Sequence, residues 1–199
     1  MAAIIFATGN KGKLKEINEI LEGTGFSVVS MKEAGYDVPI DENGASFLEN
    51  ALIKARTLCR ASGRITLADD SGLVIDALGG EPGIYSSRYM GEDTSYDVKN
   101  AAILDRMKQV SGKDRSARFV CAMAAVFPDG RELTVEETFE GEIAGSIQGE
   151  NGFGYDPIFY VPECGCTSAE LSAEAKNAIS HRGKALRKMK EKLLDEMRR

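Results

Sequence analysis

The hydrophobic residues of the chain follow two kinds of pattern. Short continuous apolar runs predict buried strands, and apolar residues spaced three and four apart predict amphipathic helices. In chain order, the pattern predicts a strand over 2–8, a helix over 11–22, a strand over 26–30, a helix over 46–62, a strand over 65–68, a helix over 94–110, strands over 119–127 and 132–143, a strand over 158–161 and a helix over 180–197. Helices alternate with strands at first, and a long hairpin turning at Pro128-Asp129-Gly130 comes later. This order indicates an α/β fold with a mixed sheet.

No linker, repeat or low-complexity tract divides the 199 residues. The length suits one domain, or two intimate lobes around one sheet. No signal peptide is visible, and the longest wholly apolar run, 119–127, is far shorter than the roughly 20 residues of a membrane span. We therefore expect a soluble, cytoplasmic protein that does not contact membranes.

The composition narrows the possible chemistry. The chain has a net charge of −6, which disfavours a role in binding the nucleic-acid backbone but leaves room for small phosphates at a local basic cluster. Its single histidine, His181, excludes zinc sites built on several histidines of one chain. Cys59 and Cys121 lie in apolar stretches and are expected in the core. Cys164 and Cys166 are expected in a surface loop, with a redox pair as the alternative.

A glycine-containing segment, Thr8–Lys13, joins the first predicted strand to the first predicted helix. Glycines let the backbone approach a ligand, and the free N–H groups of a helix start favour an anion. Lys11, Lys13 and Lys15 lie in the first turns, where the helix dipole disfavours cations. A bound polyphosphate would remove that conflict. The alternative is a set of solvated lysines at an ordinary helix start.

Two adjacent aspartates, Asp69 and Asp70, follow the predicted strand over 65–68. Adjacent carboxylates repel each other, so the pair indicates a divalent cation or a raised pKa. Carboxylate oxygens suit Mg²⁺ in particular. The alternative is an Asx-type turn that enters a hairpin. Asp41 and Glu42 form a weaker acidic pair, which taken alone is more typical of a solvated loop.

The predicted helix over 46–62 carries a second candidate. Ser46 and Glu49 have the spacing of a capping box, a structural role. Asn50 and Lys54 lie four residues apart and share one helix face. They could face a ligand or water, and the sequence alone favours water.

Two further segments offer groups that could bind a planar ligand. In 152–157, glycines flank Phe153, whose ring could lie against such a ligand with Asp156 as an acceptor. A turn that buries Phe153 is an equal alternative. Lys176, His181 and Arg182 supply donors near the start of the last predicted helix. They could also be a polar first turn and nothing more.

Taken together, six segments resemble the inosine triphosphate pyrophosphatase family, the non-canonical purine nucleoside triphosphate pyrophosphatases. They are TGNKGK at 8–13, SFLENALIKA at 46–55, ADDSGL at 68–73, GGEPGIYSSRY at 79–89, GFGYDPIF at 152–159 and KNAISHRG at 176–183. Each segment is weakly specific alone, but their order over nearly the whole chain is highly specific. The resemblance implies a long mixed sheet dividing two lobes, a nucleotide cleft between the lobes, and a homodimer. It also implies Mg²⁺-dependent hydrolysis of ITP, dITP and XTP to the monophosphate and pyrophosphate.

The resemblance also implies roles for individual residues. Asp70 is the acidic active-site position, both metal ligand and candidate base, with Glu42 and Asp69 as further metal-binding carboxylates. Lys13, Lys54 and Asn50 support catalysis at the phosphate and metal site. The residues implied in substrate binding are Thr8, Gly9, Asn10, Lys11, Gly12 and Lys13 around the triphosphate, Ser71 and Lys176 as further contacts, and Phe153, Gly154, Tyr155, Asp156, His181 and Arg182 around the base.

Three other functions remain open on the sequence. One is a pyrophosphatase of the septum-inhibitor type acting on other modified nucleotides. Another is a nucleotide-binding sensor without turnover, although a pure phosphate binder gains little from Asp69 and Asp70. The third is a redox protein that uses Cys164 and Cys166.

Overall fold

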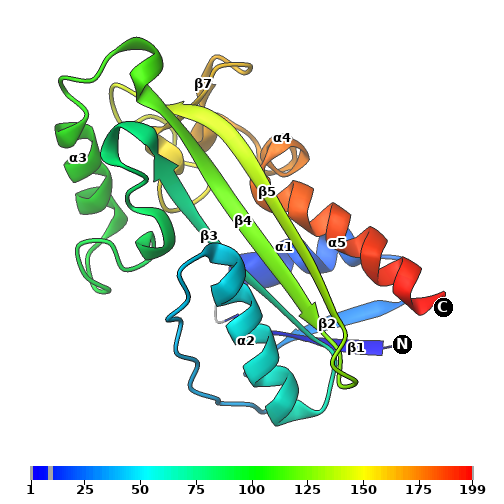
Figure 1. Cartoon of the computed structure of the whole chain (residues 1–199). Helices are drawn as coiled ribbons and strands as arrows, with labels where there is room; N and C mark the ends of the chain where they lie inside the picture. The colour runs from blue at the N-terminus through cyan, green and yellow to red at the C-terminus, as the bar shows by residue number, and fades with distance from the viewer. Residues whose placement is uncertain (1, 9–10, 199) are drawn as a thin grey trace. The chain divides into compact units, whose positions relative to one another are not determined.

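The computed structural model describes residues 2–8 and 11–198 (Figure 1). The strands are β1 (Ala2–Phe6), β2 (Phe26–Ser30), β3 (Thr66–Ile75), β4 (Ser116–Val126), β5 (Glu132–Ile143), β6 (Phe159–Val161) and β7 (Cys166–Thr167). The α-helices are α1 (Lys11–Leu21), α2 (Phe47–Ser62), α3 (Tyr96–Arg106), α4 (Ala173–Ile179) and α5 (His181–Met197). Short 3₁₀ turns join several of them.

The strands form one mixed sheet, which confirms the predicted fold class. Their order is β2-β1-β3-β4-β5-β6-β7. β1 runs parallel to β2 and β3, whereas β6 is antiparallel to β5 and β7. The predicted hairpin is present as β4 and β5, which run side by side (Figure 1). Within the described residues, no helix is long and apolar enough to cross a membrane.

Two compact units make up the chain. The first comprises the described residues of Met1–Asp70, Cys121–Glu137 and Arg182–Arg199, and the second comprises Ser71–Val120 and Thr138–His181. The chain passes from one unit to the other within β3, β4 and β5 and at the start of α5. The nucleotide cleft that the family resemblance implies stays a prediction.

Each unit has its own apolar core. In the first, Ile17 and Leu21 of α1 and Leu186, Met189 and Leu193 of α5 pack in the cluster that also holds Ile4, Phe6, Leu67, Cys121 and Met123 from the strands. In the second, Ile103 and Met107 join Leu73, Ile75, Phe119, Phe139 and Phe159. The helical spacing of apolar residues therefore did identify the buried faces of α1 and α5.

Three of the four cysteines lie where the sequence placed them, whereas Cys166 lies in β7 and not in a surface loop. Cys59 and Cys121 are buried, and Cys164 is exposed. Cys166 is half-buried, and none of the four cysteines forms a disulfide within the described residues. A disulfide between Cys164 and Cys166 is therefore not formed in this structure.

The segment around the two aspartates corrects a prediction. The strand was expected to end at Ala68, but β3 continues to Ile75, so Asp69 and Asp70 lie within the strand. The apolar run breaks at Asp69 because aspartate is charged. The strand continues because Lys13 and Arg182, from distant parts of the chain, compensate that charge, which a local pattern cannot show. The alternative of an Asx turn at this point is excluded as well.

Two other differences concern helices. The helix predicted over 94–110 is shorter, because Ser95 caps its first turn and the helix ends at Arg106. Helix α4 was not predicted. It has only seven residues, between the caps Ser172 and Ser180, too few to establish a helical period.

Candidate active site

Asp69 and Asp70 meet different partners, because successive side chains of a strand point to opposite faces. An Asp69 carboxylate oxygen lies 2.8 Å from Nζ of Lys13 on α1 and 3.8 Å from Nε of Arg182 on α5. Asp70 accepts a hydrogen bond of 3.1 Å from the side-chain amide of Asn50 and lies 3.5 Å from Nζ of Lys54. The two carboxylates are thus held separately and are not arranged as one chelating pair.

Helix α2 directs Asn50 and Lys54 toward Asp70, so the expectation that they face water was wrong. Asn50 is fully buried, and its Oδ1 accepts the backbone N–H of Gly44 at 2.9 Å. Any Cβ on Gly44 would lie 2.8 Å from that Oδ1, so glycine is required for this close approach. Lys54 is buried as well, because it compensates two carboxylates.

The start of α2 is fixed by the predicted cap. Ser46 accepts the N–H of Glu49 at 3.1 Å, as the capping-box spacing predicted. The carboxylate of Glu49 reaches back to the N–H of Ala45 at 2.6 Å, one residue before the cap residue itself. Glu49 therefore has a structural role, and the cap sets the helix from which Asn50 and Lys54 project.

Glu42 completes the surroundings of Lys54. Its carboxylate lies 2.9 Å from Lys54 Nζ, and its side chain is about one third exposed at 35%. Glu42 and Asp70 therefore both contact one ammonium group. The interpretation of Glu42 as a residue of an ordinary solvated loop does not hold.

The surroundings shift the pKa values of the two aspartates in opposite directions. Burial would raise the pKa of Asp69, but the charges of Lys13, Arg182 and Lys54 bring it far below its usual range. Burial raises the pKa of Asp70 above its usual value, and the opposing effects of Lys54 and Asn50 do not cancel this. The pKa of Lys54 is raised by its carboxylates despite its burial. Asp69 is therefore a permanent anion, whereas Asp70 is the more basic carboxylate.

Arg182 lies among acidic groups of the first unit. It is buried in the first turn of α5, and its Nη1 donates to Glu16 of α1 at 3.2 Å. Burial alone would lower the pKa of Arg182. The nearby carboxylates of Asp69 and Glu16 outweigh this effect and raise the pKa above its usual value, so the guanidinium stays charged. Its predicted part in reading the base stays a prediction. Glu16 was missed by sequence reasoning, although its position three residues after Lys13 places both on one face of α1.

The predicted phosphate segment is described in part. Thr8 is buried just beyond β1, and Gly12 and Lys13 lie in the first turn of α1. Gly9, Asn10 and the side chain of Lys11 lie outside the described residues. Of the predicted cations here, Lys13 contacts Asp69 at 2.8 Å, whereas Lys15 lies 3.7 Å from Glu19 of the same helix.

In the second unit, Asp156 organises the segment 152–157, here called the aromatic loop. One of its oxygens accepts the N–H of Phe153 at 2.8 Å and Nζ of Lys176 at 2.5 Å. The other accepts the hydroxyl of Ser168 at 2.9 Å. The Phe153 ring is 45% exposed, with Lys176 Nζ 5.1 Å from its centroid. The alternative that the turn buries Phe153 is excluded, and the ring remains accessible for stacking.

The other predicted contacts of this unit differ in accessibility. Tyr155 is buried, and its hydroxyl donates to the carbonyl oxygen of Ser86 at 2.7 Å. His181 is buried with its ring stacked on Phe119, at a centroid distance of 5.0 Å and an interplanar angle of 12°. Ser71 is half-buried and follows Asp70 directly in β3. Tyr155 thus supports the loop from within and offers no free face to a ligand.

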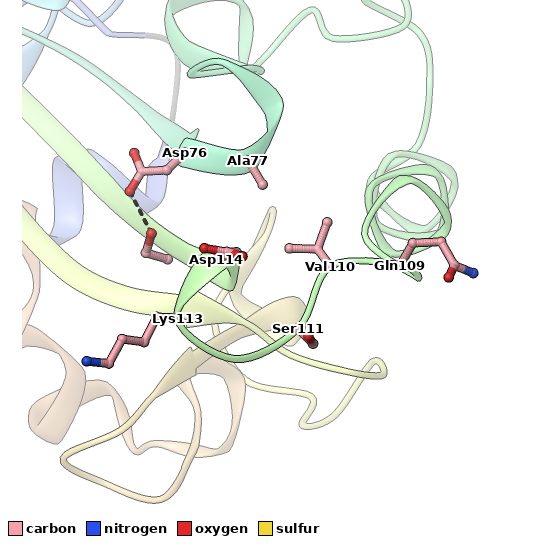
Figure 2. Close-up of a pocket in the computed structure, with 8 residues that line it drawn as sticks. Asp76, Ala77, Gln109, Val110, Ser111, Lys113 and Asp114 are labelled. Carbon is pink, nitrogen blue, oxygen red and sulfur yellow. Dashed lines mark hydrogen bonds between the residues drawn. The ribbon is translucent and has the colours of Figure 1, made fainter.

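A separate hollow of about 490 Å³ lies elsewhere on the second unit, lined by Asp76, Ala77, Gln109, Val110, Ser111, Lys113, Asp114 and Ser116. Figure 2 shows Asp76 bonded within this wall, where it accepts the Ser116 hydroxyl at 2.7 Å. Asp76 also accepts from Arg118 at 2.8 Å. None of the predicted site residues lines this hollow, so it is not the candidate active site.

The arrangement in the first unit suits phosphate chemistry. Lys13, Lys54 and Arg182 provide positive charge, and Asp70 provides a carboxylate of raised basicity. Across residues 2–8 and 11–198, no three histidine, cysteine, aspartate or glutamate side chains converge as a ready set of metal ligands. The carboxylates are instead bonded to lysines.

Comparison with known proteins identifies the family. The sequence model of the Ham1 family matches residues 4–192. The chain is 47% identical to a dITP/XTP pyrophosphatase of Thermus thermophilus, over 96% of this chain and 92% of the relative. It is 46% identical to a dITP/XTP pyrophosphatase of Geobacter sulfurreducens, over 97% of each chain.

Solved structures show the same fold. A HAM1 protein from Coxiella burnetii superposes with a TM-score of 0.91 at 41% identity, covering 98% of this chain and 100% of that chain. The Ham1 protein of Staphylococcus aureus gives a TM-score of 0.89 at 40% identity, covering 98% and 99%. The six sequence segments, the mixed sheet and these full-length matches lead to one conclusion: the chain belongs to the Ham1 family.

Proposed function

We propose that this protein hydrolyses non-canonical purine nucleoside triphosphates, namely ITP, dITP and XTP, to the nucleoside monophosphate and pyrophosphate. The relatives named dITP/XTP pyrophosphatase, at 47% and 46% identity over nearly the full length, support this substrate class. The observation that carries the proposal is the pair Asp69 and Asp70, whose pKa values are displaced in opposite directions beside Lys13 and Lys54. A pure phosphate-binding protein has no need of a buried carboxylate with raised basicity.

The residues of the first unit divide the chemistry between them. Asp70 accepts a proton from the water that attacks the α-phosphorus, a role that its raised pKa favours. Lys13 and Lys54 offset the negative charge that develops on the phosphate oxygens. Asn50 holds the Asp70 carboxylate through its 3.1 Å hydrogen bond, so that the base has a fixed orientation. Asp69 holds Lys13 in place, and pyrophosphate leaves with the electrons of the cleaved bond.

Mg²⁺ is the cofactor that the carboxylates fit. Glu42 and Asp70 already converge on one cation, Lys54 Nζ, at 2.9 and 3.5 Å, and hard oxygen donors of this kind suit Mg²⁺. Asp70 and Glu42 would hold the ion. Asp69 lies closer to its lysine, Lys13, than Asp70 does to Lys54, so we assign Asp69 a weaker part in holding the metal ion. When bound, Mg²⁺ neutralises charge on the triphosphate and makes a coordinated water more acidic.

The aromatic loop of the second unit supplies the base contacts in this proposal. The exposed ring of Phe153 offers a stacking face, and Lys176 beside it is a donor suited to a 6-oxo group. The amino group of adenine would meet such a donor with a donor of its own. An unpaired buried donor costs about 1–3 kcal/mol, or roughly 5- to 150-fold in preference for each contact.

We also propose that the protein works as a cytoplasmic homodimer. The family resemblance is the support for both statements. Size-exclusion chromatography with light scattering tests the dimer, since a mass near twice 21.5 kDa is expected.

Product analysis with ITP, dITP, XTP, GTP and ATP in the presence of Mg²⁺ tests the activity. We expect pyrophosphate and the monophosphate from the first three, little from GTP and ATP, and none after addition of EDTA. Release of orthophosphate would contradict attack at the α-phosphorus. Binding without turnover would favour a nucleotide sensor, and a preference for other modified nucleotides would favour the septum-inhibitor type.

A further inference from the structure

The first half of α3 packs against the aromatic loop and bonds to its backbone. Asn100 Nδ2 donates to the carbonyl oxygen of Gly154 at 3.0 Å. Tyr96, one turn earlier, meets the ring of Tyr155 edge-on, with a centroid distance of 5.2 Å and an interplanar angle of 87°. Gly154 has a φ of +70°, and a Cβ there would lie 3.5 Å from the Tyr96 ring. The loop backbone therefore lies directly against this helix.

Helix α3 and the loop are also joined to a common segment, Ser86-Ser87. The buried ammonium of Lys99 donates to the carbonyl oxygen of Ser87 at 2.7 Å and lies 4.8 Å from the centroid of the Tyr96 ring. The hydroxyl of Tyr155 donates to the neighbouring carbonyl oxygen of Ser86, also at 2.7 Å. These contacts fix α3 and the aromatic loop to the same backbone segment.

Asn100 is unusual because it is a buried polar residue that uses only part of its hydrogen-bonding capacity. Its side chain is only 1% exposed, and within the described part of the chain its Oδ1 atom has no hydrogen-bond partner. A buried polar atom without a partner is unfavourable, and an apolar side chain of similar size would avoid that cost. The amide therefore contributes through its bond to Gly154 more than through general stability.

The bond matters because it holds the backbone next to Phe153. Its ring is 45% exposed, so core packing does not fix it. The backbone on one side is held by the Asp156 carboxylate, which accepts the N–H of Phe153. On the other side, Asn100 holds the next residue, Gly154, by its carbonyl oxygen. Two hydrogen bonds therefore hold the backbone on either side of the ring.

We propose that Asn100 is a positioning residue for base recognition, which fixes the Gly154 peptide and thereby the stacking face of Phe153. The proposal rests on the proposed function, because it takes the loop to receive the purine. Asn100 does not touch the phosphates, so its loss weakens binding of the base and leaves the chemical step intact.

The test compares Asn100→Leu and Asn100→Ala with wild type, and uses Asn18→Leu as the matched control. Asn18 also donates its Nδ2 to backbone carbonyls, those of Leu14 and Val28, but it lies in α1 of the first unit. We expect KM for ITP to rise about tenfold in both Asn100 variants with kcat within about twofold of wild type. Inhibition by tripolyphosphate, which has no base, should be unchanged. Asn18→Leu should keep the wild-type KM.

A second measurement does not depend on turnover. Hydrogen exchange of the amides in 153–156 should be faster in the Asn100 variants, with exchange in β3 and β4 unchanged. The melting temperature of Asn100→Leu should change little, because loss of the bond to Gly154 and removal of the unpartnered oxygen offset each other. A large fall would indicate a general structural role and contradict the proposal.

The outcomes are distinct. Unchanged exchange in the loop would overturn the positioning role, and faster exchange with an unchanged KM for ITP would overturn the link to base recognition. A parallel loss of tripolyphosphate inhibition would place the effect at the phosphates and also overturn it. If wild type hydrolyses no purine triphosphate, the proposed function itself fails, whereas the exchange measurement still decides whether Asn100 holds the loop.

Discussion

Asp69 and Asp70 are neighbours in the chain, but their surroundings give them different chemistry. Asp69 is held by Lys13 and Arg182 and has a strongly lowered pKa, whereas burial raises the pKa of Asp70. A pair of titratable groups displaced in opposite directions is typical of a site where one group is an anchor and the other moves a proton. At the residue scale, the proposed mechanism therefore depends on Asp70.

Asp70→Asn should lower turnover of ITP by about 10²- to 10⁴-fold, the contribution typical of a general base. The asparagine keeps the shape of the side chain and an oxygen that can accept from Asn50, so binding of ITP should change much less. Steady-state kinetics and isothermal titration calorimetry measure the two quantities. Asp76→Asn, which removes a carboxylate outside the candidate site, is the control and should retain wild-type turnover. Near-normal turnover of Asp70→Asn would remove Asp70 from the role of base.

Residue types were easier to predict from the sequence than their surroundings. The two aspartates and Lys13 could be identified as candidates because they stand beside a predicted strand and helix start. The orientation of Asn50 and Lys54 could not, because both lie on a helix face whose polarity is equally compatible with water. What turns that face inward is Asp70, which is 20 residues away from Asn50 in the chain.

At the scale of elements, β3 shows where a local pattern fails. Its apolar run is interrupted at Asp69, so the strand was expected to end there, but it continues through Leu73 to Ile75. A charged residue can lie within a buried strand when cations from other elements neutralise it, here Lys13 from α1 and Arg182 from α5. By contrast, β2 and β5 have the predicted bounds, since nothing distant in the chain overrides their patterns.

Arg115 illustrates how one side chain joins several elements of the second unit. Its guanidinium donates to the carbonyl oxygens of Met107, Val110, Ile143 and Ala144 at 2.6 to 2.8 Å. The first two follow α3, and the last two lie at the end of β5. Lysine cannot replace this planar fork of donors with its single ammonium group.

Arg115→Lys should therefore destabilise the protein by about 2–3 kcal/mol, because two or more buried carbonyl groups lose their donors. For a chain of this length, that corresponds to a fall of roughly 4–12 °C in melting temperature. Differential scanning calorimetry measures the shift, and kcat for ITP at 25 °C should stay at the wild-type value. Arg60→Lys, on the exposed side of α2, is the control and should change stability by less than about 0.5 kcal/mol. A lowered kcat with an unchanged melting temperature would contradict the structural role of Arg115.

At the scale of the whole molecule, an acidic chain with a net charge of −6 is proposed to bind a highly charged anion. The explanation is local, because Lys13, Lys54 and Arg182 are gathered in the first unit. In the absence of ligand these cations are bonded to carboxylates, so binding must exchange some of those contacts for contacts to phosphate and Mg²⁺. The overall charge therefore gives no guide to the ligand, whereas the arrangement of a few residues does.

This exchange predicts a selective thermal stabilisation. A ligand that binds the native state at a hundred times its Kd adds about 2.7 kcal/mol to stability, or roughly 5–11 °C in melting temperature for a chain of this length. In Asp70→Asn, which should bind without turnover, ITP with Mg²⁺ should produce such a shift. At the same concentration ATP should produce a smaller one, because its 6-amino group would meet a donor in the base site. Equal shifts from ITP and ATP would show that the protein binds the triphosphate without distinguishing the base, and would contradict the proposed selectivity while leaving the phosphate site in place.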